Sequence, residues 1–355
     1  MTKTIRYEHI NPIPALTWNW LKLNRASLEA EADDLGGSIS AGCSGQAAYK
    51  EDGRALFAAL PAMKSGAGEE ADALLDAFPV TPSAVTAEKG GKATVLLRFT
   101  LEEGKSQLSR QAVVAEEGAE LTVILDYTSA PAASAFQAVQ TKLWAKAGSR
   151  IHLVKVNLLG ASCIQLDDTA AYAEDGACIN ITQIELGGAK VYAGVGATLA
   201  GYRSSFKSDT AYHTKAAQYL DMNYAVWHKG AKTDTQMQVK GVVEGDSTKV
   251  YRGTIDFQRG CAGATGDEQE ETLLLSPTAV NKSIPMILCD EEDVSGTHGA
   301  TIGRLSADEL FYMQSRGISE EAAKQMMSRA KIAAVAHLIP DATVIEEIDT
   351  FLNKR

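Results

Sequence analysis

The chain has 355 residues, enough for two or three domains or for one long core, and 45% of them are hydrophobic. The sequence never offers the roughly 20 consecutive apolar residues that a membrane-spanning helix needs, and its net charge of −11 disfavours nucleic acid as a partner. Because the first residues also lack the apolar run of a secretory signal, we expect a cytoplasmic protein with no membrane partner.

Residues 1–90 mix helical and irregular signals and are predicted to form a separate N-terminal helical or irregular region. Trp18 and Trp20 lie close together, which is typical of a local core, and a ligand-stacking pair is the alternative. Residues 68–77 are rich in Ala, Leu and acidic residues, so they are predicted to form a short helix that ends before Pro79.

From about residue 91 the apolar residues follow a period of two, and a motif repeats. An Ala-x-x-Gly sequence ends at Gly118, Gly148 and Gly176, which lie 30 and 28 residues apart, and alternating apolar residues follow each glycine. Glycine adopts the positive φ of a tight turn, and the alternation places every second side chain on a buried face. Because such a unit cannot bury its apolar face alone, the sequence predicts stacked repeats, a β-helix over residues 91–303. An antiparallel β-sandwich, which also spaces short strands with glycine turns, stays open as the alternative.

Beyond the repeats the pattern becomes helical, and residues 304–355 are predicted to form a C-terminal helical region. Ser306 and Glu309 have the spacing of a capping box, in which each side chain satisfies a backbone N–H of the other residue. Ser319 is predicted to cap a second helix, and a last helix is expected over residues 344–352.

The sequence carries no common catalytic signature: it has no phosphate-binding GxxxxGK[ST] loop, no GxSxG nucleophile turn and no HExxH zinc motif. We therefore predict that the protein is not an enzyme. The adjacent carboxylates Asp167 and Asp168 are interpreted as solvated. Four glycines within the repeats are interpreted as turns between strands, namely Gly187, Gly188, Gly194 and Gly196. Five widely spaced cysteines are interpreted as reduced and mostly buried, namely Cys43, Cys163, Cys178, Cys261 and Cys289.

Two segments near the end of the chain stand apart from the repeats. Residues 284–303 contain the sequence His-Gly-Ala-Thr at positions 298–301, and residues 310–318 read Leu-Phe-Tyr-Met-Gln-Ser-Arg-Gly-Ile. Together these segments resemble the closing signature of the SufB/SufD family, the scaffold subunits of the SUF machinery for iron–sulfur cluster assembly. The His-Gly-Ala-Thr form resembles SufD. Individually weaker matches fall in the family's order at residues 17–20, 228–230, 251–253 and 273–276.

The resemblance covers most of residues 90–335, and it implies a mainly β protein with a right-handed parallel β-helix between helical ends. Members pair through the β-helix and bind the ATPase SufC through the C-terminal helices. This chain departs from the family at Gly296, where SufD chains often carry a cysteine. His298 remains a candidate ligand for a metal ion or for a cluster at the interface between subunits, since a neutral imidazole can bind iron or zinc. A histidine that only hydrogen-bonds backbone is the alternative. Cys261 and Cys289 are weaker candidates as sulfur carriers, because burial is the simpler interpretation.

These features lead to the hypothesis of a SufD-type scaffold that joins a SufB-like subunit and a SufC-type ATPase. Leu310, Phe311, Tyr312 and Arg316 are predicted to contact the ATPase, because positions 312 and 316 share one face of a helix. Either Phe311 or Tyr312 is also expected to close the end of the β-helix. No tightly bound cofactor is expected, only a transient iron–sulfur cluster in the assembled complex. The alternatives are a SufB-like homodimer that builds the cluster itself and a β-helix enzyme that acts on polysaccharides.

Overall fold

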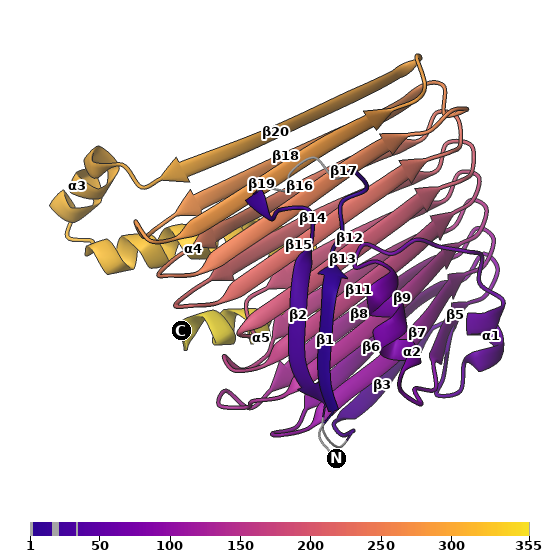
Figure 1. Ribbon diagram of the computed structural model, residues 1–355, viewed down its shortest axis with the longest axis horizontal. Coiled ribbons are helices and arrows are strands. Elements are labelled where there is room, and N and C mark those ends of the chain that lie inside the picture. Colours follow the sequence, from indigo (N-terminus) through magenta and orange to yellow (C-terminus); the bar gives the residue numbers. More distant parts are fainter. Residues whose placement is uncertain (1–2, 16–20, 33–34, 355) are drawn as a thin grey trace.

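The computed structural model describes residues 3–15, 21–32 and 35–354, and its centre is a β-solenoid of about eight turns (Figure 1). From β6 onward, successive strands alternate between two walls, and neighbouring strands within a wall run parallel. Register is kept from turn to turn, so that Leu153 lies opposite Val123 on one side and Ile181 on the other. The predicted parallel β-helix is confirmed, and the antiparallel β-sandwich is excluded.

One wall is a nine-stranded sheet in the order β20-β18-β16-β14-β12-β10-β8-β6-β3. Its strands are β3 (Ser38–Gly45), β6 (Lys92–Leu101), β8 (Glu120–Ser129), β10 (Arg150–Leu158), β12 (Cys178–Glu185), β14 (Ser205–Thr214), β16 (Asp234–Val243), β18 (Ala264–Leu274) and β20 (Val294–Arg304). The opposite wall contains β4 (Ala47–Lys50), β5 (Ser83–Ala87), β7 (Ser106–Ala115), β9 (Phe136–Ala145), β11 (Ile164–Ala173), β13 (Lys190–Leu199), β15 (Tyr219–His228), β17 (Thr248–Phe257) and β19 (Val280–Cys289).

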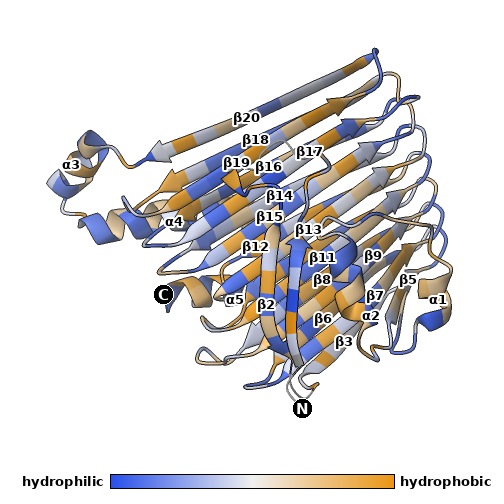
Figure 2. Ribbon diagram, viewed as in Figure 1, coloured by the Kyte–Doolittle hydropathy of each residue, from blue (hydrophilic) through white to orange (hydrophobic). Residues whose placement is uncertain are grey.

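The solenoid is held together by apolar side chains that point inward at every second position. Val123, Leu153 and Ile181 are stacked across three turns and are at most 1% exposed. Figure 2 shows the matching alternation of hydrophobic and hydrophilic residues along the strands. Gly118 and Gly148, at φ of 69° and 66°, supply the left-handed turns that the Ala-x-x-Gly motif predicts.

The N-terminal region contains more strand than predicted. The helices α1 (Arg54–Ala58) and α2 (Glu69–Asp76) are short, and α2 confirms the helix expected at 68–77. The strands β1 (Lys3–Ile10) and β2 (Ala26–Ala32) form an antiparallel hairpin on the outer face of the wall that contains β11 and β13. In β2 the residues alternate strictly between buried and exposed, and this burial overrides the helix propensity of its Ala and Glu residues. The expectation of a helical or irregular region over residues 1–90 is corrected by these strands. Trp18, Trp20 and the rest of residues 17–20 lie outside the described residues.

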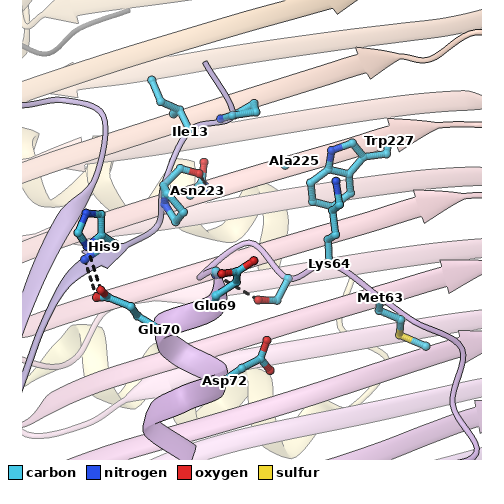
Figure 3. A pocket seen from close by; sticks show the side chains of 14 residues that line it. His9, Ile13, Met63, Lys64, Glu69, Glu70, Asp72, Asn223, Ala225 and Trp227 are labelled. Atoms are coloured by element: carbon cyan, nitrogen blue, oxygen red, sulfur yellow. Dashed lines mark hydrogen bonds and ion pairs between the residues drawn. The ribbon is translucent and has the colours of Figure 1, made fainter. Parts of the chain in front are cut away.

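The glycines of β13 have a different role from the predicted one. Gly187 and Gly188 do lie in a turn, but Gly194 and Gly196 lie within the strand. A Cβ atom at Gly194 would come within 2.1 Å of the Ala67 backbone nitrogen, so the missing side chain lets the segment before α2 lie directly on the sheet. This segment and the N-terminal strand flank a groove on the outer face of the solenoid (Figure 3).

The C-terminal region contains three helices, α3 (Ala307–Ser315), α4 (Glu320–Ala336) and α5 (Ala342–Asn353), as predicted. Ser306 forms the expected capping box with Glu309, and Ser319 caps α4. The helices α4 and α5 bury Ile332 and Ile348 against the outer face of the nine-stranded sheet. None of the helices in the described ranges is long and apolar enough to cross a membrane.

Candidate functional site

The solenoid ends in strands that are not covered. β20 is the last strand of the nine-stranded sheet and, among the described residues, pairs only with β18, while β19 ends the opposite wall (Figure 1). No residue of β20 is buried, whereas β18 alternates between buried and more exposed positions. The unpaired edge of β20 therefore presents free backbone donors and acceptors to which another strand can bind.

His298 lies on this open end. In the register of the sheet it is opposite Glu268 of β18, so its position is on the side of the strand that faces the solenoid interior. The residue is exposed and forms no hydrogen bond with the described residues. Among the described residues no three His, Cys, Asp or Glu side chains are grouped to hold a metal ion. The open end thus offers a single accessible imidazole.

Gly296 lies two residues before His298 on the same side of β20. A Cβ atom there would come within 2.9 Å of the Phe257 ring and 3.1 Å of Ile287. The glycine therefore allows these apolar side chains to fill the last turn, and a thiol at this position would have to displace them.

Charged residues are buried directly beneath the open end. Glu270 binds the ammonium group of Lys249 and the hydroxyl of Ser283, and all three lie in the interior. Glu268 is 1% exposed, and burial together with the nearby Glu270 carboxylate raises its pKa to about 8. Burial lowers the pKa of Lys249. This cluster places ionisable groups one strand below His298.

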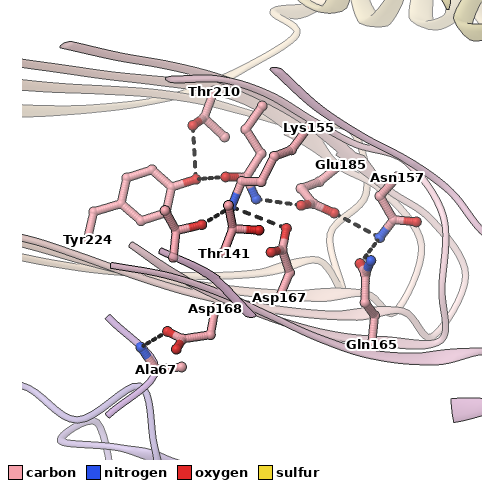
Figure 4. A network of polar contacts seen from close by, with 12 residues as sticks. Ala67, Thr141, Lys155, Asn157, Gln165, Asp167, Asp168, Glu185, Thr210 and Tyr224 are labelled. Atoms are coloured by element: carbon pink, nitrogen blue, oxygen red, sulfur yellow. Dashed lines mark hydrogen bonds and ion pairs between the residues drawn. The ribbon is translucent and has the colours of Figure 1, made fainter. Parts of the chain in front are cut away.

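A second polar cluster lies deeper in the interior (Figure 4). Lys155 and Asp167, from opposite walls, form an ion pair at 3.2 Å although both are at most 1% exposed. Asn157 joins the Gln165 amide to the Glu185 carboxylate, whose pKa is raised to about 7, chiefly by burial. Further hydrogen bonds connect this cluster to a ladder of interior glutamines, Gln107, Gln137 and Gln165. The interior of the solenoid is therefore partly polar.

The two adjacent aspartates are not solvated, which corrects their interpretation from the sequence. Asp167 and Asp168 are both fully buried, on opposite faces of β11. Asp168 points outward and accepts hydrogen bonds from the backbone N–H of Ala67 and the amide of Gln140 (Figure 4). It therefore fastens the N-terminal segment to the solenoid.

The cysteines only partly follow expectation. Cys163 and Cys261 are buried, and burial raises the pKa of Cys261 to about 11. Cys43 and Cys289 are exposed, because they lie on strands at the two ends of the solenoid with nothing stacked on one side. The prediction that most cysteines are buried is wrong. Cys289 is an exposed thiol on β19, the last strand of its wall at the open end.

The helix α3 buries none of its residues. Phe311 is 73% exposed and Tyr312 is 61% exposed, so neither side chain closes the end of the solenoid, contrary to expectation. The guanidinium carbon of Arg316 lies 5.4 Å from the centre of the Tyr312 ring, as the shared helix face predicts. Leu310 is half-buried. Two exposed aromatic side chains, and a cation in contact with one of them, are thus presented on a protruding helix (Figure 1).

Comparison with known proteins identifies the family. The family model described as "SUF system FeS cluster assembly, SufBD core domain" matches residues 87–331. The chain belongs to the SufBD family. The iron–sulfur cluster assembly protein SufD of Bacillus subtilis is 26% identical over 128 residues, which are 36% of this chain and 29% of that protein. A SufBD family protein of Staphylococcus saprophyticus is 30% identical over 129 residues, or 36% of this chain and 28% of the relative. A SufBD family protein of Mycobacterium leprae is 27% identical over 129 residues, which are 36% of this chain and 15% of that protein. The matched segments thus span less than a third of these relatives.

In this SufBD family member, the sequence motifs predicted His298 as a candidate but did not predict the buried charged residues beneath it, Glu268, Glu270 and Lys249. Glu268 lies 30 residues before His298, which is the repeat spacing, and the register places the two residues side by side. The repeat spacing thus relates Glu268 to His298 in the sequence itself. The last turn lacks the Ala-x-x-Gly motif, so the motif alone does not extend the repeat to these two residues.

Proposed function

We propose that this chain is a non-catalytic scaffold subunit of SufD type, which pairs with a SufB-like subunit and docks a SufC-type ATPase. Membership of the SufBD family supports a role in iron–sulfur cluster assembly. The absence of a catalytic motif in the sequence and the arrangement of exposed residues favour an assembly role over catalysis.

The observation that carries the proposal is the exposed face of α3. Phe311, Tyr312 and Arg316 project from a helix that buries none of its residues, and aromatic and arginine side chains dominate binding energy at protein interfaces. Because α4 and α5 anchor this region to the sheet, a motion of the ATPase would be passed through the helices to the solenoid.

Pairing with the second scaffold subunit is assigned to the open end. β20 has an unpaired edge, and Ile302 on this strand is 53% exposed. A strand from the partner would satisfy the backbone groups of this edge and cover the apolar side chain. His298 would then face the partner, and the partner would have to supply the further ligands that a transient cluster requires.

The ATPase contact is tested by co-purification with the SufC-type ATPase encoded by the same organism. The variants Tyr312→Ala and Arg316→Ala should retain much less ATPase than the wild type. Tyr202→Ala is the matched control, since this tyrosine is 46% exposed on a turn of the solenoid and also stacks with an arginine. Undiminished retention by both α3 variants would remove the assigned contact. A homodimer that holds iron and sulfide without a second scaffold subunit would favour the SufB-like role instead.

A further inference from the structure

A groove of about 710 Å³ lies on the outer face of the solenoid (Figure 3). None of the described residues that line it belongs to β20 or α3. Its floor is formed by Asn223, Ala225 and Trp227, which are successive outward residues of β15. Residues 12–14 form one wall, and residues 63–70 form the other. This volume is in the range of small-molecule sites rather than of flat protein interfaces.

The part of the groove beside α2 is acidic. Glu70 is already bound, since it accepts hydrogen bonds from the backbone and ring nitrogens of His9 at 2.7 and 2.9 Å. Asp72 accepts one from Gln140 at 2.7 Å. Glu69 is exposed at the start of α2, and no described residue forms an ion pair or hydrogen bond with its side chain. A carboxylate is therefore left for a cationic group in the groove.

Two donors lie elsewhere in the groove, Trp227 on its floor and Lys64 at the start of the wall that also contains Glu69. Trp227 is only 8% exposed, yet its indole N–H has no hydrogen-bond partner among the described residues. The ammonium nitrogen of Lys64 lies 5.5 Å from the centre of the Trp227 ring, and no described carboxylate pairs with it. An indole N–H and an ammonium group that both lack a polar partner among the described residues are suited to an anionic oxygen.

The amide of Asn223, on the floor of the groove, has a fixed orientation. The Asn223 amide nitrogen donates to the backbone carbonyls of Pro12 at 3.1 Å and Gly66 at 2.7 Å, one in each wall. These two acceptors fix the orientation of the amide. Its oxygen is buried and has no hydrogen-bond partner among the described residues, and the residue as a whole is 2% exposed. Asn223 thus links the two walls by hydrogen bonds, while its own amide oxygen has no partner among the described residues.

We propose that this groove binds a small zwitterion of the amino-acid or short-peptide class. The ammonium group of the ligand would face Glu69, and its carboxylate would bind Lys64 and the indole N–H of Trp227. Apolar side chains of Ile13, Met63 and Ala225 also line the groove, so ligands with an aliphatic side chain are favoured. This inference is independent of the scaffold role, and either can fail without the other.

The test uses the full chain and two probes, L-leucine and the dipeptide leucyl-leucine, in isothermal titration and saturation-transfer NMR. At least one zwitterion should bind, and its N-acetylated and amidated forms should each bind at least about tenfold more weakly because one charge is lost. Lys64→Met and Glu69→Gln should each weaken binding by about the same factor. Lys50→Met is the control, since Lys50 is exposed on β4 and does not line the groove.

Both variants change exposed side chains, so unchanged melting temperatures would show that the fold is kept. The proposal is overturned if neither zwitterion binds, if the blocked forms bind as well as the zwitterion, or if Lys64→Met and Glu69→Gln both bind like the wild type.

Discussion

We predict that Phe311→Ala weakens binding of the SufC-type ATPase without lowering the stability of the fold. The ring is 73% exposed. A phenylalanine buries about 200 Å² when fully covered, so docking would remove about 145 Å² of apolar surface from water. At about 25 cal/mol per Å², this burial is worth about 3.5 kcal/mol. Two effects reduce this value: docking orders the phenylalanine side chain, and the methyl group of alanine still buries some apolar surface. The expected loss of binding free energy for Phe311→Ala is therefore about 2–3 kcal/mol.

This loss corresponds to a dissociation constant for the ATPase that is about 30- to 150-fold higher. Surface plasmon resonance with the immobilised ATPase measures it directly. The free energy of unfolding should change by less than about 0.5 kcal/mol, because α3 buries none of its residues. Tyr202→Ala should leave both quantities unchanged. The reasoning is refuted if Phe311→Ala binds with the affinity of the wild type, or if it loses stability in proportion to its loss of binding.

Two further predictions concern the interior of the solenoid. Lys155→Met should lower the free energy of unfolding in urea by about 3–5 kcal/mol, because it leaves the Asp167 carboxylate buried without its partner. The double variant Lys155→Met/Asp167→Leu should recover much of this loss, and a single variant as stable as the wild type would show that the pair is unimportant. Glu268 has its pKa raised from 4.5 to about 8, so its contribution to stability is present below about pH 4.5 and is lost as the pH rises through about 8. Glu268→Gln should therefore flatten the decline of the melting temperature over this range, and an unchanged pH profile would contradict the assignment.

Local patterns in the sequence were sufficient for much of the fold. The Ala-x-x-Gly repeat located the turns at Gly118 and Gly148, and the capping residues Ser306 and Ser319 located the starts of α3 and α4. These predictions succeeded because a tight turn and a helix cap depend on residues within a few positions of one another.

Features that depend on distant parts of the chain could not be read in the same way. Gly194 resembles a turn residue, but its role is set by Ala67, which lies more than a hundred positions earlier. Asp167 and Asp168 resemble a solvated pair until Lys155 and the Ala67 backbone are brought against them. The alternation of β2 was hidden by residues with high helix propensity, since only packing on the solenoid reveals which face is buried.

The candidate site was predictable in part. The resemblance near the end of the chain located His298, and the helical period placed Tyr312 and Arg316 together. The exposure of both Phe311 and Tyr312 depends on where α3 leaves the solenoid, which no local pattern specifies.

The most direct test of the scaffold proposal is the mass, by size-exclusion chromatography with light scattering, of the complex formed with the SufB-like subunit. Ile302→Asp places a carboxylate on the open end, and Ile39→Asp places one on β3, the opposite edge strand of the same sheet, where Ile39 is 38% exposed. We predict that the wild type and Ile39→Asp pair with the subunit and that Ile302→Asp remains unpaired, because its carboxylate would have to be buried in the interface. Pairing by Ile302→Asp equal to that of the wild type would contradict the account.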